Sequence, residues 1–515
     1  MHGAEVLPGP RAAVSPASAA GIYLDRLLQR PARILVLVCL AQTVFWTLAT
    51  ATTHFAPTRD IAESYLWGHE WVIGSYKHPN LPGWLLEAGR VATGAVGWPA
   101  YLTSELLLVA TYLAVYRLGT EMMGEARALA GVLLLSGLYY TAWPSTLMNH
   151  DVVQMPLWAG IFALLWHLRA RPGYWAWLGL GVLAALGLYA KLSFGVVIAS
   201  AALWLLYDPA LRRQLVTPAP WLGLGLFAVC SLPLVGWLRA SQFSALAYAR
   251  DQSSQIGESP FEFIGGQLLT SLGVVGLAAL AGLLAWPATS LPSALPKKPA
   301  SRQPVVLYLA HMLVVPNLMT TALAWLMASG ARGMWGTPML SLVGLLIVAL
   351  APGRLDHATL KRLTVMAGAL LVAVPAIYAA DTLIEPRLTG TPKRQGWPQA
   401  EMNKRFQTLW LSQTHRPLRI VAGNFWVAGL VALSPNDMPS ILTNGDMALS
   451  PWITPERLKQ QGALLVWEMR NPAEPPPAEL VPLVGERPTG VERFDWPVFT
   501  GAPQLLIGYA IVAPN

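Results

Sequence analysis

The chain has 515 residues, of which 54% are hydrophobic and 12% are charged, and its mean hydropathy is +0.45. An average soluble domain carries about 25% charged residues, so this composition indicates a membrane protein and excludes an ordinary soluble enzyme. The formal net charge of +8 does not indicate a nucleic-acid partner, because the lysines and arginines do not cluster on a soluble surface.

The first 30 residues are rich in Ala, Pro, Ser and Gly and contain no apolar core, so we expect a disordered cytoplasmic N-terminus over residues 1–30 without a cleavable signal peptide. A transmembrane domain is expected over residues 31–380, with an outer loop over residues 53–95. Its apolar runs predict about eleven membrane-spanning helices, at 34–52, 96–116, 128–143, 151–167, 174–190, 193–207, 221–238, 263–286, 304–327, 335–351 and 363–380.

The distribution of basic residues predicts the orientation of these spans. Lysines and arginines concentrate in alternate connecting segments, and such segments face the cytoplasm. The N-terminus is therefore expected inside, and the loop over 53–95 and everything after Tyr378 are expected outside.

The composition changes at Asp381, where the long apolar runs stop and polar residues and prolines become frequent. The short runs "RIVAG", "PSILT", "GALLVWE" and "QLLIGYAIV" predict strands, and "PERLKQQG" predicts a short helix that ends at Gly462. We expect a small soluble α/β domain over residues 381–515.

The outer loop carries the stretch "RDIAESYLWGHE", which predicts an amphipathic helix that begins near Asp60 and lies along the membrane surface. Asp60 and Glu63 lie one turn apart on that helix, so their carboxylates share a face. An alternative is that Asp60 caps the helix and Glu63 is its reciprocal partner, because Asp-x-x-Glu fits a capping-box pattern.

The same loop continues as "YKHPNLPGW", which places Lys77 and His78 directly before Pro79. Proline restricts the preceding residue to extended geometry, so the two side chains should be held on a stiff loop. The alternative is that Lys77 snorkels at the interface and His78 has no role.

A second polar group, Asn149, His150 and Asp151, lies at the outer end of a predicted span. Asn149 or Asp151 could cap that helix, yet a carboxylate beside the hydrocarbon is costly and is a functional candidate by default. Lys191 divides two apolar runs and is either a hairpin tip or a buried charge. Acids and cations from separate outward segments predict one site.

Such a set suits a lipid carrier whose phosphate lies at the membrane surface. Basic side chains can pair with that phosphate. Transfer of a sugar from it needs a carboxylate to activate the acceptor and positive charge to hold the departing phosphate.

The stretch "DIAESYLWGHEWVIGSYKHPNLPGW" resembles the first outer loop of the dolichyl-phosphate-mannose protein mannosyltransferase-like family, in the bacterial branch with aminoarabinose lipid A and galacturonosyl transferases of the GT-C superfold. Asp60 and Glu63 match its acidic motif, and Lys77, His78 and Pro79 match its basic motif, with Asn80 in place of the usual second proline. The segments "MNHDVVQMPLWAG", "GLYAKLSFGV", "ARGMWGTP" and "SPWITPERLKQQGALLVWE" extend the resemblance in order along the chain.

The resemblance implies an inverting glycosyltransferase of the bacterial inner membrane, with its site and C-terminal domain in the periplasm. The implied donor is a polyprenyl-phosphate sugar, and the implied acceptor is lipid A, lipopolysaccharide core or another envelope glycolipid, with a protein acceptor less favoured. No cofactor is implied; a divalent cation remains an open alternative, although no ligand spacing for a metal is found. The implied site residues are Asp60, Glu63 and Asp151 in catalysis, Lys77, His78, Lys191, Arg250 and Arg332 around the donor phosphate, and Tyr76, Asn149 and His150 shaping the site.

A transporter or flippase of a lipid-linked sugar is the main alternative, because its cations would bind the same phosphate without a base. Transporters favour charges near the membrane midplane, whereas these polar residues gather at one face. The sequence therefore favours the enzyme.

Overall fold

The computed structural model describes residues 23–254, 259–284, 302–327, 329–351, 355–498 and 501–515. Most of the N-terminal segment that was predicted to be disordered lies outside these residues. Its end, residues 23–28, is helical rather than disordered, because Leu24, Leu27 and Leu28 pack against the helical core.

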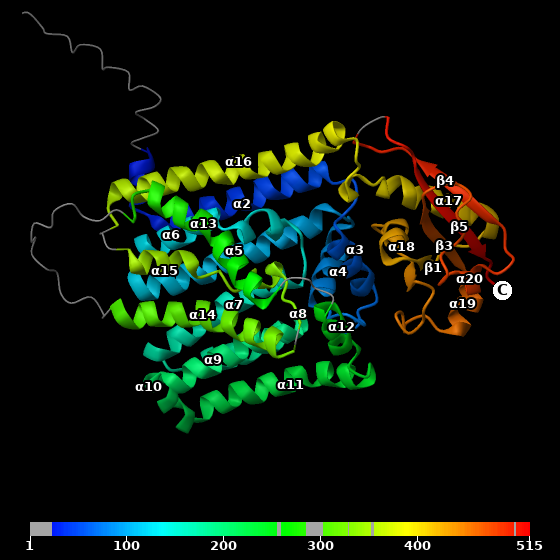
Figure 1. Cartoon of the computed structure of the whole chain (residues 1–515). Helices are drawn as coiled ribbons and strands as arrows, with labels where there is room; N and C mark the ends of the chain where they lie inside the picture. The colour runs from blue at the N-terminus through cyan, green and yellow to red at the C-terminus, as the bar shows by residue number, and fades with distance from the viewer. Residues whose placement is uncertain (1–22, 255–258, 285–301, 328, 352–354, 499–500) are drawn as a thin grey trace, which may run out of the picture.

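The larger part of the molecule is a bundle of apolar helices (Figure 1). Seven of them in the described residues are long and apolar enough to cross a membrane, and an eighth span forms if a pair of helices bent by 88° is taken as one. The long helices are α2 (Pro31–Thr53), α5 (Trp98–Met123), α7 (His150–Ala170), α11 (Pro218–Ala240), α13 (Pro260–Leu280), α14 (Arg302–Leu326) and α16 (His357–Thr389). The shorter ones are α6 (Glu125–Leu134), α8 (Tyr174–Ala190), α9 (Gly195–Tyr207), α10 (Pro209–Arg212), α12 (Ser244–Ser254) and α15 (Val343–Leu350).

The predicted polytopic helical fold is thus confirmed, but the count of eleven spans is not. The run predicted at 128–143 is helical only to Leu134 and continues as 3-10 turns, and the run at 335–351 is an eight-residue helix, α15, after another such turn. Gly137 lies inside the first run and Pro144 directly follows it, and Gly336 and Pro338 lie inside the second, as expected for breaks at the two weakest helix formers.

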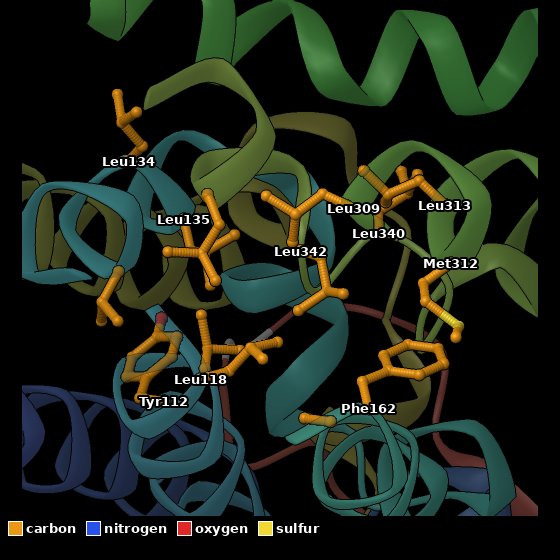
Figure 2. Packing of buried hydrophobic residues seen from close by; sticks show 14 of the residues in the cluster. Tyr112, Leu118, Leu134, Leu135, Phe162, Leu309, Met312, Leu313, Leu340 and Leu342 are labelled. Carbon is orange, nitrogen blue, oxygen red and sulfur yellow. The ribbon is translucent and has the colours of Figure 1, made fainter. Parts of the chain in front are cut away.

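The bundle core is formed by interdigitating side chains from α5, α7, α14 and the segment before α15. Figure 2 shows Leu118, Phe162, Met312 and Leu342 meeting in it, and all four side chains are completely buried. Lipid tails are as apolar as these side chains, so close packing rather than the exclusion of water holds such helices together. Where α8 crosses α11, a Cβ at Gly181 would collide with the carbonyl oxygen of Gly223.

Two outer helices, α3 (Arg59–His69) and α4 (Leu81–Thr93), lie between the bundle and the C-terminal domain (Figure 1). The predicted helix near Asp60 is therefore present, but it is enclosed by protein, because every residue from Ile61 to Gly68 is buried. Leu66 packs into the same cluster as Val427 and Leu430 of the C-terminal domain. Gly68 lets α3 approach α4, since a Cβ there would collide with the Gly83 carbonyl.

The C-terminal domain contains one five-stranded sheet in the order β2-β1-β3-β5-β4. Strands β1, β2 and β3 are parallel, with Val421 beside both Ile441 and Leu464, and β5 is antiparallel to β3 and β4. The strands are β1 (Ile420–Gly423), β2 (Ser440–Thr443), β3 (Ala463–Met469), β4 (Thr489–Phe494) and β5 (Leu505–Val512), and the helices are α17 (Gln399–Thr414), α18 (Phe425–Ala432), α19 (Pro455–Gln461) and α20 (Val481–Val484).

This architecture confirms the predicted α/β fold and the four predicted strands. The predicted short helix is α19, and it ends before Gly462, whose φ is +67°. Strand β4 was missed because it is an edge strand with only its last residue, Phe494, buried. Helix α16 continues through the predicted domain boundary at residue 381 and ends at Thr389.

Candidate active site

The loop that carries Lys77 and His78 is a tight turn closed by backbone hydrogen bonds. The Ser75 amide donates to the His78 carbonyl at 2.9 Å, and Gly74 and Pro79 form an isolated β-bridge. The Asn80 side chain donates to the Trp67 and Val72 carbonyls, both at 2.9 Å. Asn80, which stands where the resembling family has a second proline, thus ties this loop to the end of α3.

Asp60 lies in the first turn of α3. The N-cap is Thr58, which makes no side-chain cap bond, so the alternative in which Asp60 caps the helix is wrong. Asp60 lines a cavity of about 430 Å³ together with Arg59, Lys393 and Arg394. Its side chain forms no hydrogen bond or ion pair with any residue that the structure describes.

Lys77 is enclosed rather than extended into the membrane surface, so the snorkelling alternative is wrong. Its Nζ atom lies 2.5 Å from Glu63 Oε1, and the two side chains are 14% and 11% exposed. The rings of Tyr76, Tyr248 and Phe425 surround the ammonium, with centroids 5.5, 5.6 and 4.8 Å from Nζ. Electrostatic attraction between the ring faces and the ammonium stabilises its charge.

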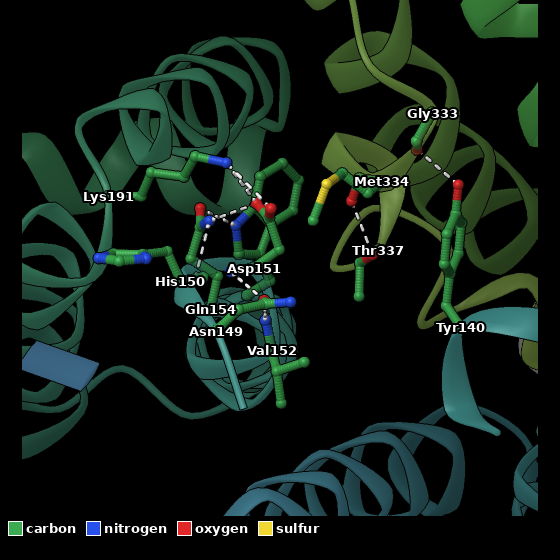
Figure 3. Close-up of polar contacts among 11 residues, drawn as sticks. Tyr140, Asn149, His150, Asp151, Val152, Gln154, Lys191, Gly333, Met334 and Thr337 are labelled. Carbon is green, nitrogen blue, oxygen red and sulfur yellow. Dashed lines mark hydrogen bonds and ion pairs between the residues drawn. The ribbon is translucent and has the colours of Figure 1, made fainter. Parts of the chain in front are cut away.

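A second ion pair joins α7 to the end of α8. Lys191 Nζ lies 2.8 and 3.0 Å from the two carboxylate oxygens of Asp151, as Figure 3 shows. Gln154 also donates to Asp151 at 3.2 Å. Asn149 is the N-cap of α7, because its Oδ1 accepts from the amides of Asp151 and Val152 at 2.9 and 3.0 Å. Both alternatives for Lys191 hold: it lies at the turn between α8 and α9, and its paired side chain is only 12% exposed.

The two ion pairs meet through a pair of histidines. The rings of His78 and His150 lie 4.4 Å apart between centroids, and Trp67 lies 6.4 Å from His150. The Nε2 atom of His150 is buried and has no hydrogen-bond partner among the described residues. In Figure 3 the His150 ring points away from the Asp151 carboxylate, toward the side where the outer loop lies.

Burial governs the ionisation of the groups on the outer loop. Asp60 is exposed toward its cavity, but the protein around it limits its solvation and raises its pKa; the Asp151 carboxylate raises that pKa further, against the opposing charges of Lys77, Lys191 and Arg59. Burial also raises the pKa of Glu63, although the Lys77 ammonium opposes this. Burial lowers the pKa of His78 well below its usual range, and the nearby His150, Lys191 and Lys77 add to the effect. This lowered pKa favours the neutral imidazole of His78.

The two predicted arginines lie farther out. Arg332 is exposed and donates to Gln252 of α12 at 3.1 Å, and Arg250 is exposed on the same helix. The backbone beside Arg332 is anchored by the Tyr140 hydroxyl, which donates to the Gly333 carbonyl at 2.5 Å (Figure 3). Neither arginine enters the buried part of the cluster, and their role at the donor phosphate stays a prediction.

Several residues at the site carry no sequence signal. Tyr248 belongs to α12 and Phe425 begins α18, while Lys393 and Arg394 belong to the linker after α16. The linker is held at the cavity because the amides of Phe55 and Ala56 donate to the Gln395 carbonyl at 2.8 and 3.0 Å. Within the described ranges, no group of three or more His, Cys, Asp or Glu side chains is placed to hold a metal ion.

The chain matches known proteins in sequence and in fold. A family model described as dolichyl-phosphate-mannose-protein mannosyltransferase matches residues 77–237. A lipopolysaccharide core galacturonosyltransferase, RgtB of Rhizobium johnstonii, is 24% identical over 428 residues, which cover 81% of this chain and 83% of that protein. The crystal structure of ArnT from Cupriavidus metallidurans bound to undecaprenyl phosphate has a TM-score of 0.61 at 13% identity and covers 92% of this chain and 97% of ArnT. Its apo state has a TM-score of 0.58 at 14% identity, over 96% and 98% of the two chains.

The chain has the GT-C fold of ArnT and is similar in sequence to glycosyltransferases. This confirms the family resemblance and the predicted enzyme class, and the apolar helices make it a multi-pass membrane protein. The segment that matches the family model begins at Lys77 and includes His78, His150, Asp151 and Lys191. The catalytic, phosphate-binding and substrate-shaping roles of individual residues remain predictions.

Proposed function

We propose that this GT-C glycosyltransferase transfers a sugar from a polyprenyl-phosphate donor to an envelope glycolipid with inversion at the sugar carbon. The name of RgtB, as a lipopolysaccharide core galacturonosyltransferase, supports a glycolipid acceptor. The undecaprenyl phosphate bound to ArnT supports a lipid-phosphate donor. The concentration of basic residues in the opposite connecting segments supports a periplasmic site in a bacterial inner membrane.

One observation carries this proposal. Three carboxylates lie in the cluster, and two of them, Glu63 and Asp151, are paired with Lys77 and Lys191. Asp60 alone of the three has no such partner in the described chain, and it faces a cavity. A carboxylate with a raised pKa is a stronger base than an ordinary aspartate. Because no cation is paired with the Asp60 carboxylate in the described chain, its oxygens are available to accept a proton.

In the proposed reaction, Asp60 accepts the proton of the acceptor hydroxyl as that oxygen forms a bond to the anomeric carbon of the donor sugar. The bond from this carbon to the phosphate oxygen breaks at the same time, and the electron pair leaves with the polyprenyl phosphate. Lys77 and Lys191 hold the departing phosphate, and Glu63 and Asp151 position the two lysines. A single displacement of this kind inverts the configuration at the anomeric carbon.

The two histidines complete the proposed phosphate site. His150 offers a buried Nε2 atom without a partner in the described chain, and His78 lies against it. A neutral imidazole can donate one hydrogen bond, so we propose that these rings add hydrogen bonds rather than charge to the phosphate. Tyr76 and Asn149 act through position: Tyr76 borders Lys77, and Asn149 fixes the start of α7.

The variant Asp60→Asn tests the proposal. Purified enzyme in proteoliposomes would receive a polyprenyl-phosphate sugar and a lipopolysaccharide core acceptor, and the released polyprenyl phosphate and the glycosylated product would both be measured. Loss of a general base lowers the rate about 10²- to 10⁴-fold. Asp437→Asn, at an exposed position of the C-terminal domain, is the matched control and should keep full activity.

Two results would overturn the proposal. Undiminished transfer by Asp60→Asn would remove Asp60 as the base, and a product that retains the donor's anomeric configuration would exclude the single displacement. Movement of the donor across the bilayer, followed in the same vesicles, separates the enzyme from a flippase. A flippase needs no base, so wild-type movement without transfer would favour that alternative.

A further inference from the structure

A second cavity, of about 260 Å³, lies in the C-terminal domain where its parallel strands end. Its walls include Asn424, which directly follows β1, and Glu468 of β3. Strand β1 lies between β2 and β3 in the sheet. The chain therefore passes from β1 to β2 on one side and then crosses to β3 on the other side. In open α/β sheets, ligands bind outside the carboxyl ends of the strands at such a reversal.

The aromatic walls of this cavity carry unused hydrogen-bond donors. Trp426 and Trp467 both line the cavity and are 4% and 3% exposed. Neither indole nitrogen has a hydrogen-bond partner among the residues that the structure describes. A buried donor without a partner is costly. The Trp467 nitrogen lies against Gly508 of β5, so we assign the donor for a bound oxygen atom to Trp426.

The charged walls select the class of ligand. Arg59 and Arg394 line the cavity together with Glu468 and Glu479. Arginine recognises phosphate or carboxylate oxygens, and carboxylates accept hydrogen bonds from hydroxyl groups. The N-terminus of α18, where the Asn424 side chain accepts from the Trp426 amide at 2.9 Å, adds partial positive charge. A ligand that carries both an acidic group and hydroxyl groups matches these two kinds of charged side chain, and an anionic sugar is such a ligand.

The cavity also adjoins the catalytic one. Arg59 and Arg394 line both this cavity and the cavity that contains Asp60. The guanidinium of Arg394 lies 5.7 Å from the Trp426 ring centroid, and that of Arg59 lies 4.9 Å from the Phe425 ring centroid. A ligand in the second cavity therefore lies one side chain away from the proposed base.

We propose that this second cavity binds the acceptor, through a sugar unit that carries a phosphate or carboxylate group. The inference rests on the proposed function, because it assigns the acceptor end of that reaction. The volume of about 260 Å³ is near the lower end of ligand pockets, roughly 300 Å³, so it suits one sugar unit rather than a whole glycolipid. The neighbouring unit would then reach Asp60 past the two arginines.

Direct binding can be measured on the full-length enzyme in lipid nanodiscs by saturation-transfer difference NMR. The probes are glucose 1-phosphate and glucuronic acid, with glucose and inorganic phosphate as comparison ligands. Trp426→Phe keeps an aromatic ring and removes the indole N–H, and Glu468→Gln keeps the shape and removes the charge. Glu486→Gln, at an exposed position of the same domain, is the control.

We expect both anionic sugars to bind the wild type and the Glu486→Gln control. Each of the two cavity variants should weaken that binding about ten-fold, as for the loss of one hydrogen bond to or from a charged group. Equal binding to all variants would overturn the inference. Full displacement of the sugars by inorganic phosphate at equal concentration would also overturn it, because it would show an anion site without sugar recognition.

Steady-state kinetics of sugar transfer distinguish binding of the acceptor from binding of the donor. Trp426→Phe and Glu468→Gln should raise the apparent KM for the acceptor about ten-fold and raise that for the donor much less. A larger rise in the donor KM would place the donor sugar here and overturn the acceptor assignment. Wild-type enzyme that transfers no sugar would refute the proposed function. Transfer that depends on Asp60 but has an unaltered acceptor KM in both variants would refute this inference alone.

Discussion

Arg90 fastens the outer helices to the C-terminal domain, and its replacement by methionine has a calculable effect. Arg90 Nε and Nη2 donate to the two carboxylate oxygens of Glu87, each at 2.7 Å, and Nη1 donates to the Pro435 carbonyl in the C-terminal domain. The two side chains are 8% and 3% exposed. Arg90→Met therefore leaves a buried carboxylate whose remaining partner in the described residues is His69, at 3.4 Å.

The magnitude follows from the ionisation of Glu87. Burial raises its pKa, but the hydrogen bonds from Arg90 and His69 outweigh burial and lower the pKa from 4.5 to about 2. At 1.36 kcal/mol per pKa unit this difference corresponds to about 3 kcal/mol, and solvent screening reduces it to about 2 kcal/mol. The folded-state pKa is the lower one, so this contribution is present above about pH 4.5 and is lost as the pH falls toward 2.

Hydrogen exchange of the α4 amides measures the effect in the full-length enzyme. A loss of about 2 to 3 kcal/mol in local opening free energy speeds exchange roughly 30- to 150-fold. The double variant Glu87→Gln/Arg90→Met removes both charges and should recover most of the protection, because no unpaired buried charge remains. Arg117→Met is the control: its ion pair with Glu121 involves a 65% exposed arginine, and such pairs contribute about 0 to 1 kcal/mol.

Two outcomes would refute this reasoning. One is an exchange rate of the α4 amides in Arg90→Met within about three-fold of the wild-type rate. It would show that the ion pair between Arg90 and Glu87 does not stabilise α4. A double variant that exchanges as fast as the single one would show that the unpaired Glu87 charge is not the cause.

Four further changes have defined outcomes. Lys77→Met should raise the KM for the donor about ten-fold or more, because a charged contact with the donor phosphate is lost. Initial rates measure this KM, and an unchanged value would show that Lys77 does not bind the phosphate. The value of kcat/KM should rise with pH as Asp60 loses its proton and then level off. The midpoint of this rise should lie above 3.8, the ordinary aspartate pKa, because burial raises the pKa of Asp60. A midpoint at 3.8 would contradict this prediction. Gly68→Ala should cost about 1 to 3 kcal/mol, read by thermal unfolding, because the new methyl meets the Gly83 carbonyl. Asn149→Ala should lower the free energy of unfolding by about 1 kcal/mol, because α7 loses its N-cap. An unchanged thermal unfolding temperature would show that this cap does not stabilise the protein.

Local patterns in the sequence predicted those features that depend on neighbouring residues. The run "QLLIGYAIV" predicted β5 because its apolar, β-branched and aromatic residues suit a buried strand. The cap at Asn149 and the end of α19 before Gly462 were predictable because capping needs only a few consecutive residues. The stiff geometry at Lys77 and His78 followed from Pro79.

The partners of the charged residues could not be predicted in this way. The sequence suggested one group of acids and one of cations, whereas the structure pairs Glu63 with Lys77 and Asp151 with Lys191. The second pair joins positions 40 residues apart, and only the packing of α7 against α8 decides which lysine a carboxylate meets. The Asp-x-x-Glu pattern was ambiguous because it does not show where the helix begins. The structure places the N-cap at Thr58, so Asp60 lies inside the first turn and its carboxylate does not cap the helix.

Residues contributed by distant segments were also beyond the sequence. Tyr248 and Phe425 complete the ring cage around Lys77, yet neither belongs to a motif and their positions are far from residue 77. Arg394 reaches the site because the linker after α16 returns to pair with Phe55 and Ala56. Such contacts are set by the tertiary fold rather than by local spacing.

The position of Phe425 over Lys77 also constrains the order in which the enzyme becomes functional. Phe425 belongs to the last fifth of the chain, so ribosomes make it after every helix of the bundle. Until that domain folds and docks, the Lys77 ammonium lacks one wall and is open to bulk water, which weakens its hold on an anion. Catalytic competence should therefore arrive in one late step of biosynthesis, after the C-terminal domain has docked.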